Sequence, residues 1–216
     1  MFEGFCPETF DFLWGIRLNN EKTWFEAHKA DYIRYLYEPM KVLGQEVFSA
    51  FSHVPAMELH VSRIYRDARM HPPFPYKESL WFSIRYRVEE WSRHPTLYFD
   101  IRPEGASYGF SLWRPTPAVM EEFRQDLLSR PSHFPQLLQQ AQRESGLPFT
   151  AECYKRPKPC DNAALAPYFG WKGDLSAGAF LEPGEKLFTP GLVGQLHSAL
   201  LPWVPVCEYF YTFTQD

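Results

Sequence analysis

The chain has 216 residues, of which 45% are hydrophobic and 22% are charged, a composition typical of globular proteins. Its formal net charge of −4 argues against wholesale electrostatic coating of nucleic acid or of an anionic membrane. No apolar run approaches the roughly 20 residues of a membrane span, and the acidic Glu3 precedes any apolar stretch, unlike the basic start of a signal peptide. We therefore expect a cytoplasmic protein that does not enter a membrane.

The first fifty residues are predicted to be helical. The pair Asn19-Asn20 is typical of a helix cap. Aromatic residues follow it at three- and four-residue spacing: Trp24, His28, Tyr32 and Tyr35. Proline lacks the N–H that a helix interior needs, so Pro39 marks a junction, and a second helix is expected from about Met40 to Phe51.

The period then changes to that of β-strands. Apolar and polar residues alternate from Met57 to Tyr65, and three more strand-like runs follow, namely Ser79–Arg87, Thr96–Arg102 and Tyr108–Arg114. Short segments of turn composition separate the last three runs. Sequential strands with short connections favour an antiparallel meander.

The second half returns to helical patterns, over Thr116–Ser129, Pro131–Ser145 and about Pro190–Leu201. A short strand is expected near Leu175–Leu181. Helices before and after a central antiparallel sheet define the α+β class. Since no linker is long enough to divide the chain, residues 1–216 are predicted to form a single domain.

Several kinds of chemistry leave no pattern here. The cysteines Cys6, Cys153, Cys160 and Cys207 form no Cys-x-x-Cys pair, and the spacing from Cys153 to Cys160 matches no common zinc pattern. The seven histidines form no metal-binding motif, and there is no nucleophile elbow, phosphate-binding glycine loop or dinucleotide fingerprint. We expect reduced cysteines, no metal and no cofactor. No motif decides whether the protein is an enzyme, and the oligomeric state stays unknown.

The segment from residue 63 to residue 87 inverts the charge of the chain. It holds six basic and two acidic residues, a local charge of +4, which leaves −8 on the remainder. Guanidinium groups are planar forks that grip phosphate or carboxylate at two points. We interpret Arg63, Arg66, Arg69 and Lys77 as ligands for a small anion.

Three neighbouring residues are candidates for chemistry at this anion site. Asp67 would orient one of the arginines, and Tyr76 or His71 would donate a proton. The alternative is structural: Arg and Asp at a strand end also tie loops to a sheet through partly buried ion pairs. That alternative predicts that Asp67 is buried and fully paired within the protein.

The stretch Arg63-x-x-Arg66-Asp67-x-Arg69, followed by Tyr76-Lys77, resembles the signature of the family known as domain of unknown function 2461. Other pieces agree in order: Asn19-Asn20 with Trp24-Phe25, Pro39-Met40, Leu112-Trp113-Arg114-Pro115 and Lys155-Arg156-Pro157-Lys158. The resemblance spans nearly the whole chain. It implies a single α+β domain of about this length and assigns no reaction.

The loop after Arg69 departs from that family. An aromatic residue, then Asp or Asn followed by Lys, usually stands there. This chain has Met70 in the aromatic position and the run 71–74, His-Pro-Pro-Phe, in place of the acid–Lys pair. A role for that pair in catalysis would therefore be missing here, and His71 is the group that could replace it.

Further basic and aromatic groups permit a second interpretation. Arg114 and the run Lys155-Arg156-Pro157-Lys158 would line the same concavity as the anion site, or form solvated faces. Trp81, Trp91 and Trp113 alternate with basic residues on the predicted sheet. We expect these tryptophans in the core, because aromatic residues are common strand formers. The alternative is a non-catalytic module that binds protein or single-stranded nucleic acid on an aromatic and basic sheet face.

Overall fold

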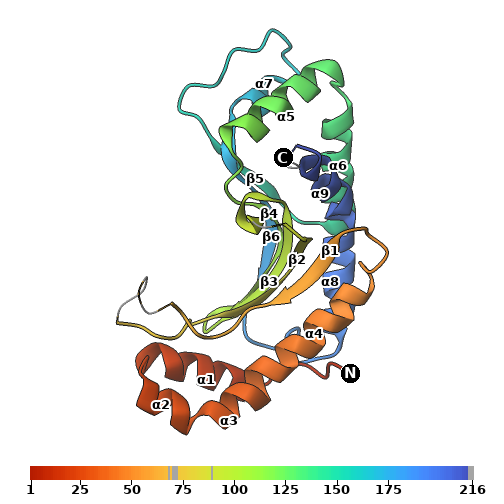
Figure 1. The fold of residues 1–216 in the computed structure, drawn as a ribbon. Coiled ribbons are helices and arrows are strands. Elements are labelled where there is room, and N and C mark those ends of the chain that lie inside the picture. Colours follow the sequence, from red (N-terminus) through yellow and green to blue (C-terminus); the bar gives the residue numbers. More distant parts are fainter. Residues whose placement is uncertain (68, 70–72, 89, 214–216) are drawn as a thin grey trace.

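A six-stranded sheet forms the centre of the molecule in the computed structural model, which describes residues 1–67, 69, 73–88 and 90–213 (Figure 1). The strands are β1 (Met57–Val61), β2 (Leu80–Tyr86), β3 (Thr96–Arg102), β4 (Gly105–Leu112), β5 (Phe149–Cys153) and β6 (Trp171–Leu181). Their spatial order is β1-β2-β3-β4-β6-β5, and every neighbouring pair is antiparallel. The predicted antiparallel α+β fold is confirmed.

The predicted strands agree with β1 to β4 in position and differ at their ends. Strand β1 ends at Val61 rather than near Tyr65, and β4 begins at Gly105 rather than at Tyr108. The strand expected near Leu175 is the end of the longer β6. Strand β5 was not predicted, because it is a short edge strand with irregular register against β6 and a mostly exposed sequence.

Helices precede, interrupt and follow the sheet. They are α1 (Pro7–Leu18), α2 (Lys22–Ala27), α3 (Lys29–Asp31), the π-helix η1 (Tyr32–Tyr37), α4 (Glu38–Ser49), the 3₁₀ turn η2 (Trp91–Arg93), α5 (Pro117–Ser129), α6 (His133–Ser145), α7 (Ala166–Phe169), α8 (Gly191–Leu200), the 3₁₀ turn η3 (Leu201–Trp203) and α9 (Val204–Tyr211). None of those in the described residues combines the length and apolar character that crossing a bilayer requires.

The predicted N-terminal helices exist, with a different subdivision. The aromatic run from Trp24 onward is divided between α2, α3 and η1, and the residue that caps the start of α2 is Glu21. Pro39 lies in the first turn of α4. Because proline has no N–H, the carbonyl of Tyr35, four residues earlier, needs another donor. The buried Thr9 of α1 supplies it, with 2.6 Å from its Oγ1 to that carbonyl oxygen.

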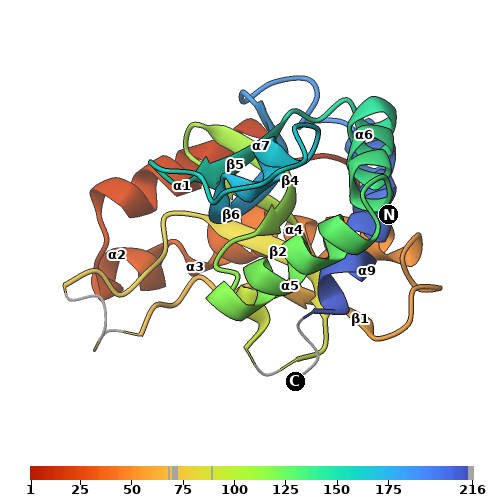
Figure 2. The ribbon, with the colours of Figure 1, turned by 90° about the horizontal axis from the view of Figure 1, so that it is seen from above.

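Helices cover one face of the sheet. Helix α4 packs on β1 and β2, and α8 packs on α4 and β4. Seen from above, α6 lies beside α9, next to the same covered face (Figure 2). The alternate residues that point to these helices are apolar and buried, such as Leu80, Phe82 and Ile84 of β2 and Phe99 of β3. A single core cluster connects residues from Phe2 to Phe210.

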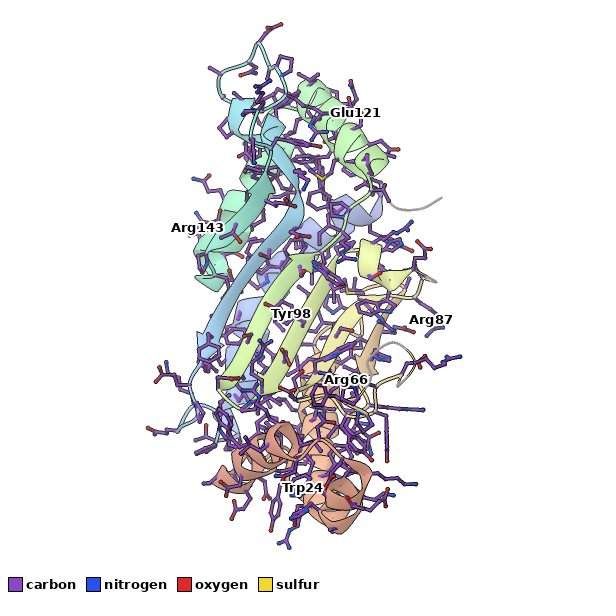
Figure 3. All side chains as sticks on the ribbon, turned by 90° about the vertical axis from the view of Figure 1, so that its left-hand side faces the viewer. Trp24, Arg66, Arg87, Tyr98, Glu121 and Arg143 are labelled. Carbon is purple, nitrogen blue, oxygen red and sulfur yellow. The ribbon has the colours of Figure 1, made fainter. Side chains whose placement is uncertain are left out.

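The opposite face of the sheet is concave and carries polar side chains. In Figure 1 the sheet curves between α1–α3 at the bottom and α5 and α7 at the top, and no α-helix of the described residues lies against its left side. Figure 3 looks directly onto this face, with Tyr98 near its middle. The strands here follow the alternation of antiparallel sheets that have one face packed and one face solvated.

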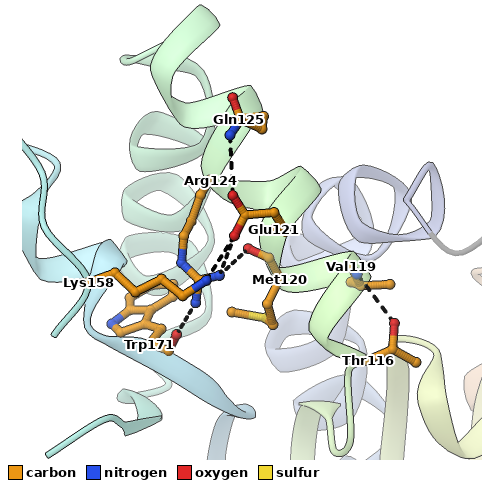
Figure 4. Close-up of polar contacts among 8 residues, drawn as sticks. All are labelled: Thr116, Val119, Met120, Glu121, Arg124, Gln125, Lys158 and Trp171. Atoms are coloured by element: carbon orange, nitrogen blue, oxygen red, sulfur yellow. Dashed lines mark hydrogen bonds and ion pairs between the residues drawn. The ribbon is translucent and has the colours of Figure 1, made fainter. Parts of the chain in front are cut away.

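A buried arginine connects α5 to the sheet (Figure 4). Arg124 is 2% exposed, and its Nη2 donates to the carbonyl of Trp171 in β6 at 2.7 Å. Its Nη1 donates to the carbonyl of Met120 at 2.9 Å and lies 3.4 Å from Oε2 of Glu121. The same carboxylate accepts from Lys158 at 2.9 Å. Lys158, in the loop between β5 and α7, is therefore paired with an acid of α5.

Replacement of Arg124 by Met should lower the free energy of unfolding by about 1–3 kcal/mol, because the carbonyl of Trp171 loses a charged donor and stays buried. Methionine keeps the apolar stem, so the change reports mainly the lost hydrogen bonds. The measurement is urea unfolding. Arg143→Met, at a side chain 77% exposed on α6, is the matched control and should change stability little. Equal stabilities of the two variants would contradict the structural role of Arg124.

Candidate functional site

A hollow of about 560 Å³ lies on the concave face of the sheet. Strand register aligns the side chains of this face in rows across β2, β3, β4 and β6. The rows are Arg85, Thr96, Ser111 and Ser176; then Ser83, Tyr98, Gly109 and Gly178; then Trp81, Asp100, Ser107 and Phe180. Seven of these residues line the hollow, namely Trp81 and six polar residues that we call the polar floor: Ser83, Thr96, Tyr98, Asp100, Ser111 and Ser176.

Glycines make room for the central tyrosine of the polar floor. Tyr98 lies opposite Gly109, which lies opposite Gly178. A Cβ atom at Gly178 would lie 3.1 Å from the hydroxyl oxygen of Tyr98. Burial raises the pKa of Tyr98, and the charge of Asp100 raises it further. The phenol is therefore a neutral hydroxyl at physiological pH.

Two atoms of the polar floor are buried without a hydrogen-bond partner among the described residues, Oγ of Ser83 and Oδ1 of Asp100. The other oxygen of Asp100 accepts a hydrogen bond from Arg102, which also lines the hollow. A buried polar atom left unpaired costs about 1–3 kcal/mol, and folded proteins seldom tolerate it without a reason. Both atoms belong to residues that line the hollow, so a bound molecule could satisfy them.

Aromatic side chains line one side of the hollow and form what we call the aromatic wall. The ring of Trp81 lies 5.3 Å from that of His60 and 5.7 Å from that of Trp91, measured between centroids. Trp81 and Trp91 are half-buried, and Trp113 is 51% exposed. The expectation that these tryptophans lie in the core is wrong. Trp81 alternates with the buried Leu80 and is therefore directed to the concave face.

A buried cation lies behind this wall. The guanidinium of Arg85 lies 4.4 Å from the ring centroid of Trp91, and the residue is 8% exposed. Its Nε and Nη1 have no hydrogen-bond partner among the described residues, and Nε is 3.8 Å from a carboxylate oxygen of Glu58. Burial lowers the pKa of Arg85, and Glu58 opposes that shift. Arg85 belongs to the basic segment 63–87 and was not among the predicted anion ligands.

Lys77 lies at the edge of the hollow, next to Trp81, and Arg63 and Arg66 lie on the chain segment paired with it. We call these three predicted anion ligands the rim cations. Nζ of Lys77 donates to the carbonyl of Arg63 at 2.7 Å and lies 5.7 Å from the ring centroid of Trp81. Burial lowers the pKa of Lys77, and the charge of Arg66 lowers it further. Within the described part of the chain, no carboxylate lies within 4.0 Å of any rim cation.

An asparagine holds the segment that carries the rim cations. Oδ1 of Asn20 accepts from the backbone N–H of Tyr76 at 3.0 Å, and its Nδ2 donates to the carbonyl of the same residue at 3.0 Å. Backbone hydrogen bonds from Arg66 to Pro75 and from Lys77 to the carbonyl of Ile64 join the two arms of the segment. The backbone of Lys77 is therefore held in position by its own bond to Ile64 and by the bonds of Asn20 to the preceding Tyr76.

The remaining candidates lie in different surroundings. Tyr76 is 4% exposed, and its ring stacks on Phe25 with 4.3 Å between centroids, so it belongs to the core. Arg69 binds Asp67 through Nε at 3.0 Å and Nη2 at 2.7 Å, which raises the pKa of Arg69. The side chains of Asp67 and Arg69 are 43% and 88% exposed. The structural alternative expected a buried Asp67, and the structure does not show one.

Arg114 and His71 are the last two candidates from the sequence. Arg114 follows β4 at the opposite end of the polar floor from Lys77, and its guanidinium lies 4.2 Å from the ring centroid of Trp113. His71 lies outside the described residues. All four cysteines are free, and the described residues contain no group of three or more His, Cys, Asp or Glu that could hold a metal ion.

Comparison with protein families identifies the chain. The model of a family described as conserved hypothetical protein (DUF2461) matches residues 8–171. The chain belongs to this family. The matched part contains the rim cations and all of the polar floor except Ser176, which lies on β6 beyond it. Comparison with curated proteins gave no match.

Replacement of Asn20 by Ala should lower the free energy of unfolding by about 2 kcal/mol, because two partly buried backbone groups of Tyr76 lose their partners. Asn19→Ala is the matched control, since the Asn19 side chain makes one exposed hydrogen bond, to the carbonyl of Gly15. Thermal unfolding followed by circular dichroism measures both. A smaller loss for Asn20→Ala than for Asn19→Ala would contradict the role given to Asn20.

The two histidines next to the hollow predict a loss of stability in mild acid. Burial lowers the pKa of His60 from its ordinary 6.5, and the charge of Arg85 lowers it further, against Glu58. Burial also lowers the pKa of His94. As the pH falls, the unfolded chain therefore takes up protons before the folded histidines do, and the free energy of unfolding should fall from pH 7 to pH 5.

Urea unfolding at pH 7, 6 and 5 measures this dependence. His60→Gln should make the fall shallower, because the folded and unfolded chains then differ by one proton-binding group fewer. His53→Gln, at an exposed residue of the turn before β1, is the control and should leave the slope as in the wild type. A slope unaffected by His60→Gln would show that this imidazole is not responsible.

Proposed function

We propose that this protein binds a small anionic ligand in the hollow on the concave sheet face, with the anionic group at the rim cations. The observation that carries the proposal is that Lys77 lies beside Trp81, bound to the carbonyl of Arg63 and under the influence of the charge of Arg66. None of these three cations has a carboxylate partner within 4.0 Å among the described residues. Like charges held together repel one another, and a bound phosphate or carboxylate would relieve that repulsion.

The shape of the face favours a small ligand over an extended one. A volume of about 560 Å³ falls within the range of small-molecule pockets. A flat platform of aromatic and basic residues would instead suit single-stranded nucleic acid or a protein. That second function remains an outcome of the experiment below, since Trp113 and Arg114 are exposed at the far end of the floor. Catalysis is left open, and the cytoplasm stays the expected location.

The test is the binding of inorganic phosphate at constant ionic strength, followed by thermal unfolding and by calorimetry. We expect phosphate to stabilise the wild type and its effect to weaken with added NaCl. Each charge-assisted contact is worth about 1.5–3 kcal/mol. Lys77→Met and Arg66→Gln should therefore each reduce affinity by at least about 10-fold.

Arg143→Gln is the matched control and should bind phosphate like the wild type. Figure 3 shows Arg143 on the α6 side of the molecule, far from Arg66. General salt effects on the protein surface are the same in all variants and cancel in this comparison. Equal binding by wild type and Lys77→Met would contradict the proposal. Tight binding of a single-stranded oligonucleotide without binding of phosphate would favour the second function.

A further inference from the structure

The polar floor beyond the rim cations has its own chemistry. Its residues are hydroxyl-bearing except for Asp100, and a hydroxyl both donates and accepts hydrogen bonds. Oγ of Ser83, a residue only 2% exposed, and Oδ1 of Asp100 lack partners among the described residues. Ser83 lies directly opposite Tyr98, and Asp100 directly opposite Trp81. Ser83 and Asp100 are thus diagonal neighbours on adjacent strands.

The charge of Asp100 selects what can lie on the floor. An ionised carboxylate accepts hydrogen bonds and repels an anion. One of its oxygens is held by Arg102, so the other needs a neutral or cationic donor. An anion at the rim cations and a hydrogen-bond donor at Asp100 therefore belong to different parts of one ligand. A hydroxyl group fits both Asp100 as a donor and Ser83 as a donor or acceptor.

The wall beside the floor offers an apolar surface to the same ligand. The Trp81 ring lines the hollow and lies between the rim cation Lys77 and the floor residue Asp100. A sugar ring presents C–H groups on its faces and hydroxyls around its edge. Its face can displace water from an indole ring while its edge forms hydrogen bonds with the floor.

We propose that the ligand of this site is a sugar or similar polyol that carries an anionic group. The hydroxyls bind Asp100, Ser83 and Tyr98, a ring face packs on Trp81, and the phosphate or carboxylate binds the rim cations. This inference rests on the proposed function for the position of the anion. It adds the polar floor as the part of the site that distinguishes a sugar phosphate from any other phosphate ester.

The test compares ligands that share an anion and differ in hydroxyl groups. Calorimetry measures ribose 5-phosphate and glucose 6-phosphate against methyl phosphate, and gluconate against acetate. At least one hydroxyl-rich ligand should bind 10-fold or more tightly than its plain counterpart. Asp100→Asn and Ser83→Ala should each reduce this preference toward one. The affinity for methyl phosphate should stay as in the wild type in Ser83→Ala and should not fall in Asp100→Asn, which loses a charge that repels anions.

Two variants are used so that a folding defect in one of them does not decide the result. Asp100→Asn loses the ion pair with Arg102, whereas Ser83→Ala removes only a hydroxyl that has no partner among the described residues. Ser83→Ala should therefore fold at least as stably as the wild type. Ser107→Ala, in the same row as Asp100 and outside the lining of the hollow, is the control and should keep the preference.

Failure of this inference can be distinguished from failure of the proposed function. If methyl phosphate and acetate bind through Lys77 while no hydroxyl-rich ligand binds better, the anion site stands and the sugar assignment is overturned. A preference that survives both Asp100→Asn and Ser83→Ala also overturns it. If no anion of either kind binds the wild type, the proposed function itself is wrong.

Discussion

The six-stranded sheet buries only one of its faces, and most features of the molecule depend on that asymmetry. Helices α4 and α8 pack on the apolar face, where Phe82 and Phe99 are fully buried. Among the described residues, only the short 3₁₀ turn η2 lies against the other face, which is polar and concave (Figure 3). Because side chains alternate along a strand, the residues before and after a buried one point to the concave face. The core and the candidate site are thus two faces of the same strands.

The second constraint is the attachment of the segment before β2. It approaches the sheet as an irregular loop, in which Tyr65 and Tyr76 form an isolated bridge. Asn20 pairs with both backbone groups of Tyr76 and supplies from a side chain what a neighbouring strand would supply. The stacking of Tyr76 on Phe25 adds an apolar anchor. The N-terminal helices therefore position Lys77 at the edge of the hollow.

The charges of the site are separated rather than neutralised. Among the described residues, the rim cations lack carboxylate partners, whereas Arg69 pairs with Asp67 and Arg102 pairs with Asp100. Next to Trp81 the polar floor thus carries Asp100, one oxygen of which is buried and has no partner in the described part of the chain. A ligand with an anion at one end and hydroxyl donors at the other complements both regions. The rim cations and the polar floor would thus act as one site.

Some of the site could be predicted from local sequence alone. The excess of positive charge over residues 63–87 identified Arg63, Arg66 and Lys77, because a charge imbalance is a property of composition. The same pattern could not separate Arg69, whose partner Asp67 is two residues away, from arginines that have no acid beside them. Arg114 looked equivalent in sequence, yet strand register places it at the far end of the floor.

Sequence by itself determined the antiparallel α+β fold, since the period of apolar residues changes from helix to strand and back, and short turns leave few ways to connect strands. It did not determine which face of the sheet the helices cover, and so Trp81 was assigned to the core. The polar floor could not be predicted either, because Ser83, Asp100 and Ser176 are far apart in the chain. Only the pairing of four strands places them on one face. Tertiary structure decided the site because hydrogen-bond register, which depends on contacts between distant segments, decides which side chains become neighbours.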